Sequence, residues 1–255
     1  TFFKFAGTYL YGDHSISFGV EREQYDVFNL FIQETEGEYV FNSISDFEAG
    51  IPSAVIYENA AGTNNPIDGA GQFKYAVNTA YAQDEFYIVD HDVTVTYGLR
   101  YDWYTTSDTP RVNQSFTDTY GFANDAPLDG EGLLQPRLGV NWMASPELEV
   151  RGGIGLYSGG NPNVWLSNNY SNNGVSLYQA ATPSDFFNAD NTLFDIPHTG
   201  SGRPLIDIPQ QLFDEVTAAD GRGPVNALDP NFKLPKEWKY ALGATYTFDS
   251  GYVVM

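Results

Sequence analysis

The segment 159–174 carries the side chains of this sequence that are best suited to binding a ligand. It combines six asparagines with Trp165 and Tyr170. Amides donate and accept hydrogen bonds while aromatic rings offer flat faces for stacking, so this mixture suits a sugar or a peptide. The alternative is that Asn and Gly only satisfy turns. The predicted ligand-binding residues are Asn161, Asn163, Trp165, Asn168, Asn169, Tyr170, Asn172 and Asn173.

Acidic side chains gather in three long stretches, the last of which includes 159–174. Segments 33–72, 105–134 and 159–235 together hold 20 Asp and Glu against four Lys and Arg, whereas the whole chain has 33 against 12 and a net charge of −21. Such an excess of negative charge suits solvation of a crowded surface, or binding of calcium or of a cationic ligand. Segment 125–131 has calcium-like side chains without EF-hand spacing, so we read it as a turn. Loop-bound calcium is thus the one possible cofactor, and otherwise none is expected.

No group of residues has the spacing of a catalytic or metal centre. His14, His91 and His198 are scattered, and cysteine is absent, which removes thiolate metal sites and cysteine nucleophiles. The glycine pairs at 69–71 and 200–202 do not connect a strand to a helix, as a phosphate loop would. The acid excess argues against a nucleic-acid partner. We therefore expect neither an enzyme nor a metal site.

The elements that would position these side chains are strands. Over 91–104 and 238–249 apolar and polar residues alternate strictly, which predicts strands with one apolar face. Weaker alternation over 3–9, 16–20, 75–81, 138–142 and 148–156 gives seven full strands and the start of an eighth near the end of the chain. No convincing helical period competes with them.

The connections alternate between short and long. Links near 10–14, 89–91, 144–147 and 249–251 have tight-turn compositions, and the links between them run over about 25–72, 105–134 and 159–235. In an antiparallel up-and-down array, all tight turns then lie at one edge and all long loops at the other. Transmembrane β-barrels of the bacterial outer membrane have this asymmetry. The predicted fold is therefore all-β, an antiparallel up-and-down transmembrane barrel with long extracellular loops.

The two faces of the predicted strands differ in kind. One face has rings toward its ends and aliphatic residues toward its middle, as lipid-facing bands do: Val93, Val95, Tyr97, Leu99, Tyr101, Trp103, Trp238, Tyr240, Leu242, Tyr246 and Phe248. The other carries glycines beside the bases Arg100, Arg137, Arg151 and Lys239, which suits a wide lumen. These bases are expected to pair with acids of neighbouring strands, such as Glu149, or with a plug. The alternative is a soluble β-sandwich with its core on the aromatic face.

Several motifs resemble those of TonB-dependent outer-membrane receptors. The hairpin from Tyr81-Ala-Gln-Asp-Glu-Phe86 to Val95-Thr-Tyr-Gly-Leu-Arg-Tyr-Asp102 is similar to a barrel hairpin of that family. The segments Gln135-Pro-Arg-Leu-Gly-Val-Asn-Trp142, 151–162 and 234–243 resemble its Oar-like branch. The resemblance implies a 22-stranded barrel, plugged by an N-terminal domain and energised by the TonB complex. Residues 1–255 would then be an internal part of a barrel domain, without its plug, its TonB-contacting segment or its closing strands.

The expectation from residues and resemblance is an outer-membrane receptor that binds an extracellular ligand in its loops and imports it. Its partners would be outer-membrane lipid, its own plug, the TonB complex and a ligand that the sequence does not identify. Two alternatives stay open. One is a structural or adhesive surface protein whose loops hold a partner protein, and the other is a soluble β-sandwich that binds carbohydrate.

Overall fold

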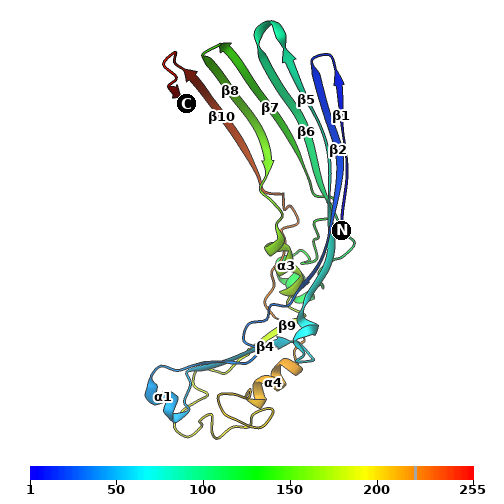
Figure 1. The fold of residues 1–255 in the computed structure, drawn as a ribbon. Helices are drawn as coiled ribbons and strands as arrows, with labels where there is room; N and C mark the ends of the chain where they lie inside the picture. The colour runs from blue at the N-terminus through cyan, green and yellow to red at the C-terminus, as the bar shows by residue number, and fades with distance from the viewer. Residues whose placement is uncertain (221–222) are drawn as a thin grey trace.

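The computed structural model describes residues 1–220 and 223–255, and its main element is one antiparallel sheet of eight strands (Figure 1). Each strand pairs with its neighbours in chain order, apart from the segments inserted in the long connections. The strands are β1 (Phe2–Tyr11), β2 (His14–Asn29), β5 (Gly71–Ile88), β6 (Val93–Thr105), β7 (Gly132–Ser145), β8 (Leu148–Ser158), β10 (Lys236–Thr247) and β11 (Val253–Val254). Seven full strands and a two-residue eighth confirm the prediction from alternation. The sheet is open, with β1 and β11 at its edges.

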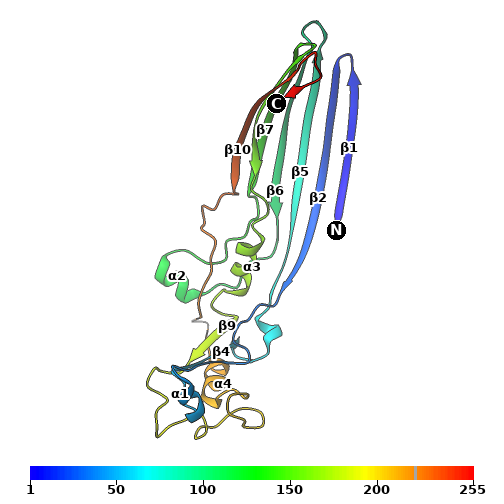
Figure 2. The same ribbon diagram turned by 60° about the vertical axis from the view of Figure 1, so that its left-hand side comes forward.

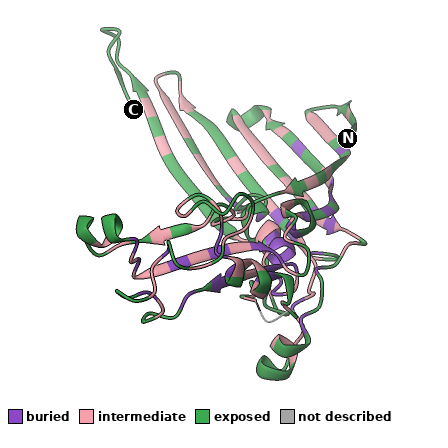
Figure 3. Cartoon of the chain, turned by 90° about the horizontal axis from the view of Figure 1, so that it is seen from below, coloured by how far each residue is buried: buried purple, intermediate pink, exposed green. Residues whose placement is uncertain are grey.

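The strand register places the aromatic and aliphatic residues on one face. Leu99 lies opposite Ala82 and Pro136, and Leu242 lies opposite Gly152. All predicted lipid-facing residues within strands share this face, and Phe248 follows directly after β10. Leu99 is 54% exposed and Leu242 is 85% exposed. In Figure 3 the strands are mostly exposed or half-buried, while buried residues gather in the loop region.

The predicted lumen-facing bases all lie on the opposite face. Arg137 lies opposite Gly98 and Gly155, and Arg151 lies opposite Gly243. Arg100 and Lys239 have the same parity on their strands. In the described residues the only other sheet has three strands and lies beyond one end of the large sheet (Figure 1). The soluble β-sandwich is therefore wrong, because no second sheet covers the aromatic face.

The four tight turns lie together at one edge of the sheet, as predicted (Figure 1). Gly12 turns the chain between β1 and β2 with φ 56°, and Gly251 does so before β11 with φ 83°. Between β5 and β6 a 3₁₀ turn, η2 (Val89–His91), ends at Asp92, whose φ is 51°. The Asp92 carboxylate accepts a hydrogen bond from the Tyr87 hydroxyl at 2.7 Å, which holds this turn against its strand.

The long connections contain regular structure that the sequence pattern did not reveal. They hold the helices α1 (Ile44–Ala49), α2 (Gln114–Tyr120), α3 (Asn163–Ser171) and α4 (Gln210–Thr217), the 3₁₀ turn η1 (Pro66–Gly69), and a second sheet of β3 (Glu38–Val40), β4 (Ala54–Ala60) and β9 (Leu177–Ala181). The helices are short, and of the four α4 has a clear apolar side, with Leu212 and Val216 buried. Side-chain caps define the starts of two of them: Ser43 accepts from the Asp46 amide at α1, and Asn113 from the Phe116 amide at α2. Among the described residues, no helix has the length and apolar character needed to cross a bilayer.

The second sheet and α4 form a distal module with its own core. Val55, Leu193, Leu212 and Val216 are each 0% exposed and pack together there. Figure 2 shows this module at the far end of the molecule from the tight turns, with α2 and α3 between it and the large sheet. The two segments that build it, from the connections β2–β5 and β8–β10, pair through β4 and β9. Residues far apart in the sequence therefore fold as one unit.

Candidate functional site

Helix α3 lies against the ends of β2 and β5, on the lumen side of the sheet. Tyr75 points to the same side of β5 as Tyr81, which lies opposite the lumen-facing Arg100. The Phe73 and Tyr170 rings stack at 4.1 Å, and those of Tyr25 and Tyr75 stack at 4.8 Å. Because α3 packs on this side, it lies across the region where the lumen would open toward the loops.

Most of the predicted ligand-binding residues hold this helix in place. Asn163 accepts a hydrogen bond from the Tyr75 hydroxyl, and Asn161 accepts one from the Tyr104 hydroxyl, both at 2.5 Å. Asn169 donates to the Ala126 carbonyl at 3.3 Å. These side chains fasten 159–174 to the strand ends and to the neighbouring loop.

Tyr170, Asn172 and Asn173 also act within the loop. Tyr170 donates to the Asp108 carbonyl at 2.6 Å, and burial together with the nearby Asp108 carboxylate raises the pKa of Tyr170 to about 12. Asn172 caps the end of α3, and the buried Asn173 amide bonds to Tyr170 and Ser176. The turn-forming alternative thus describes these asparagines well, while ligand contact by them stays a prediction.

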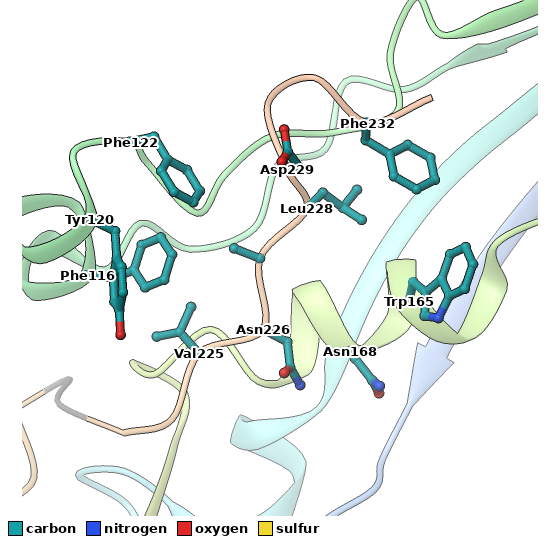
Figure 4. A pocket seen from close by; sticks show the side chains of 11 residues that line it. Phe116, Tyr120, Phe122, Trp165, Asn168, Val225, Asn226, Leu228, Asp229 and Phe232 are labelled. Atoms are coloured by element: carbon teal, nitrogen blue, oxygen red, sulfur yellow. The ribbon is translucent and has the colours of Figure 1, made fainter. Parts of the chain in front are cut away.

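Trp165 and Asn168, by contrast, face an open hollow. We call it the aromatic hollow, and it has a volume of about 670 Å³, within the range of roughly 300–1,000 Å³ typical of small-molecule sites. Figure 4 shows aromatic rings on two sides of it, Phe116, Tyr120 and Phe122 on one side and Trp165 and Phe232 on the other. Trp165 is 54% exposed and meets Phe232 edge-on at 6.2 Å. Apolar platforms are therefore left open to solvent.

The sequence pattern did not reveal most of the hollow. Its wall combines α2, α3 and the segment 225–232, which meet only in the folded chain. An isolated bridge between Asn173 and Val225 and a hydrogen bond of 2.7 Å from the Asn226 amide to the Asn172 carbonyl join the last two of these. The one local signal was the aromatic spacing of Phe116, Tyr120 and Phe122, which the strand analysis did not use.

A second hollow of about 580 Å³ lies between α3 and the ends of β2 and β5. It shares Asn168 with the aromatic hollow, and its rings come from Tyr25, Phe28, Phe31, Phe73 and Tyr75. Phe31 is 61% exposed. Helix α3 therefore presents side chains to open space on two sides.

Three of the four lumen bases pair with an acid on their own strand, whereas pairing with a neighbouring strand was expected. Arg100 lies 2.9 Å from the Asp102 carboxylate and Arg151 lies 3.8 Å from Glu149. Lys239 lies 3.6 Å from Glu237. Among the described residues Arg137 has no carboxylate partner, and its guanidinium sits 4.6 Å from the centre of the Tyr157 ring. These pairs make a charged, glycine-lined wall of the kind that borders water or another folded element.

One carboxylate interrupts the aromatic face. Asp84 lies opposite Ile16 and Tyr97, on the side of the apolar residues. It accepts a hydrogen bond from the Tyr97 hydroxyl at 2.8 Å and lies 2.7 Å from His14 Nδ1. The group is only 8% exposed and lies toward the tight turns. Tyr97 and His14 are thus hydrogen-bond partners of one carboxylate oxygen of Asp84, which lies on the otherwise apolar face.

The loop acids hold no preformed metal site in the described residues, where no three His, Asp or Glu side chains are grouped for a cation. In the calcium-like segment, Asp129 accepts from the Thr106 amide at 2.9 Å and Glu131 pairs with Lys233 at 2.9 Å. These two carboxylates stabilise the loop through their contacts with Thr106 and Lys233. Calcium binding by the loops stays a prediction.

The loop bases are also engaged. Arg111 donates to the Ser176 hydroxyl, and Arg203 lies 3.4 Å from Asp207. The Arg203 amide and guanidinium lower the pKa of Asp207 from 3.8 to about 2. Arg222 lies outside the described residues. Arg203 and Lys233 are thus paired with carboxylates and Arg111 with an uncharged hydroxyl, and the acids of the described loops far outnumber these bases.

Together, the open antiparallel meander, its apolar outer face, its polar inner face and its one-sided long loops define a transmembrane β-barrel of the bacterial outer membrane. The family model of the outer membrane beta barrel domain matches residues 3–255, so the chain belongs to that family. Membership places the protein in the bacterial outer membrane. Neither the curated proteins nor the solved structures gave a significant match.

Proposed function

We propose that this barrel domain belongs to a receptor that captures an extracellular ligand and imports it through a plugged lumen, energised by TonB. The observation that carries the proposal is the aromatic hollow, built beside α3 at the loop end of the lumen face. An open site of small-molecule size at that place suits capture before passage. The glycine-lined inner face leaves room for a plug, and no covalent chemistry is needed.

Uptake by intact cells tests this proposal. Cells with and without the full-length protein are grown in the same medium, and mass spectrometry follows which solutes disappear. We expect at least one solute whose depletion requires the protein and stops when a protonophore dissipates the proton gradient, because TonB draws on that gradient. Identical depletion profiles in the two strains would contradict import.

A second candidate function is adhesion to a partner protein through the distal module. The observation that favours it is an exposed apolar cluster on that module, with Ile44 79%, Phe47 50% and Phe194 59% exposed. Exposed apolar groups on a surface often mark contact sites. Replacing all three by Ser should reduce cell–cell aggregation if this function holds, whereas solute depletion should not change.

A further inference from the structure

We propose that the aromatic hollow binds an uncharged, hydroxyl-rich saccharide. This inference rests on the proposed import function, and it adds the chemical class of the ligand and the residues that recognise it. The side chains that carry it are Trp165 and Phe232 on one wall, Phe116 on the other, and the amides of Asn168 and Asn226 between them.

Charge selects against anionic ligands. Among the described residues no Lys or Arg lines the hollow, and Asp229 is the one carboxylate of its lining. The long loops around it add further negative charge, because they hold 20 Asp and Glu against four Lys and Arg. A phosphorylated or carboxylated ligand, or an anionic metal chelate, would enter against this field, and the described lining offers it no Lys or Arg.

The two amides supply the polar contacts that a saccharide needs. In the described part of the chain, no hydrogen bond is recorded for the side-chain amide of Asn168 or of Asn226, and Figure 4 shows both pointing the same way. The other asparagines of 159–174 hold the loop in place, so these two differ from them. An amide both donates and accepts, which matches a sugar hydroxyl that does the same.

The rings supply the apolar contacts. Trp165 is exposed and fixed edge-on by Phe232, and Phe116 is fixed edge-on by Phe122 at 5.2 Å. Rings held in this way lose little conformational freedom when a ligand stacks on them. The C–H face of a pyranose ring is flat and apolar, and its rim carries hydroxyls. Flat rings flanking amides complement both features.

A peptide that binds as an added strand fits the same place less well. Peptides bound in extended form add a strand to a free sheet edge, but the walls here are α2, α3 and the segment 225–232 rather than strands. The backbone at 225–226 is already paired with that at 172–173. The hollow therefore offers side chains for recognition and no free strand edge.

Binding to the full-length protein in detergent micelles tests the inference. The protein is applied to an array of neutral, acidic and amino-sugar oligosaccharides, and affinities for the hits are measured by Trp fluorescence and calorimetry. We expect neutral glycans to bind and acidic glycans to be excluded. No binding to any neutral glycan would overturn the inference, as would preference for acidic or cationic probes.

Variants identify the site. Trp165→Ala and Asn226→Ala should each weaken binding of a neutral glycan about tenfold, because each removes about one stacking or hydrogen-bonding contact. Tyr252→Ala, an exposed ring at the opposite, tight-turn end of the sheet, is the control and should leave affinity unchanged. Unchanged affinity in both hollow variants would show that the glycan binds elsewhere and would overturn the inference.

The outcomes separate this inference from the import function. If neutral glycans bind with the expected variant effects but proton-gradient-dependent depletion is absent, the ligand class stands and import fails. If depletion occurs but only of a solute that is not a neutral glycan, import stands and the ligand class fails.

Discussion

Asp102 shows how single polar residues organise the inner face of the sheet. It is only 9% exposed, and its carboxylate accepts from Thr79 and Gln135, both at 2.6 Å, as well as from Arg100. Three strands thus meet at one side chain, since these residues lie on β5, β6 and β7. We expect Asp102→Ala to lower the free energy of unfolding by about 1–3 kcal/mol, because three partners lose their acceptor.

Glu149→Ala is the matched comparison for that change. Glu149 is more exposed, lies 3.8 Å from Arg151 and accepts one solvent-exposed hydrogen bond from Asn141, so its loss should cost about 1 kcal/mol or less. Reversible unfolding in lipid or detergent measures both variants. Equal losses would show that the Asp102 network adds nothing beyond an exposed ion pair.

Asp207 makes stability in the distal module depend on pH. Its pKa is lowered from 3.8 to about 2 by hydrogen bonds from Arg203 and Ser201. A carboxyl group with a lowered folded-state pKa stabilises above its unfolded pKa, and the contribution disappears as pH falls through the folded value. We expect Asp207→Asn to reduce protection of the module from hydrogen exchange at neutral pH, with the difference from wild type closing between about pH 4 and 2.

The control for this pH dependence is Asp185→Asn. Asp185 is exposed and no hydrogen bond is recorded for it, so this variant should match wild type across the range. A difference for Asp207→Asn that persists unchanged at pH 2 would contradict the assignment to ionisation.

At the level of single residues, the sequence predicted Trp165 and Asn168 as ligand-binding residues, but it could not distinguish them from their neighbours. Six asparagines in one stretch look alike until the fold shows which have partners. Asn163 meets Tyr75 across 88 positions of chain. Only the tertiary structure reveals such a contact.

Among the elements, the strands were the most predictable, because period two is a local property of the sequence. Strict alternation on β6 and β10 predicted which residues share a face of the sheet. The ends of the strands were less predictable: β2 continues to Asn29, although a loop was expected from about residue 25. Tyr25 and Val27 continue the strand because they pack beside α3 and the ends of β5, a partner that alternation does not report.

The face assignment is tested by paired substitutions on β6. Leu99→Arg places a charge on the outer face and should cost about 2–4 kcal/mol near the middle of the bilayer. Thr96→Arg, on the inner face of the same strand, should cost much less because the new group meets water. Unfolding in lipid bilayers measures both, and equal penalties would contradict the orientation.

For the whole molecule, the division into a sheet and a distal module was not predictable from the sequence. The segments that build the module are separated by more than 100 residues, and its helices are short. The sequence indicated only that the loops were long and acidic. Folded loops of this length nevertheless agree with the rule that long unstructured connections are uncommon.

The module should unfold separately from the sheet. Leu212 is 0% exposed in the module core, so Leu212→Ala should destabilise the module by about 2–5 kcal/mol through the cavity it leaves. Hydrogen exchange should rise throughout β4, β9 and α4 while the heat-dependent gel migration of the barrel stays unchanged. Ile206→Ala, at an exposed position, serves as the control. If Leu212→Ala but not Ile206→Ala abolished the heat-dependent gel migration of the barrel, the module and the sheet would unfold as one cooperative unit.

The great length of β2 and β5 has a consequence for how the protein meets its surroundings. They have 16 and 18 residues, whereas about 9–11 residues of a tilted strand cross the hydrocarbon. The additional strand residues extend the barrel wall beyond the hydrocarbon by roughly 18 Å at ordinary strand rise and tilt. Molecules diffusing in the medium therefore meet the entrance above the lipid head groups, at the height of the sugar coat on the cell.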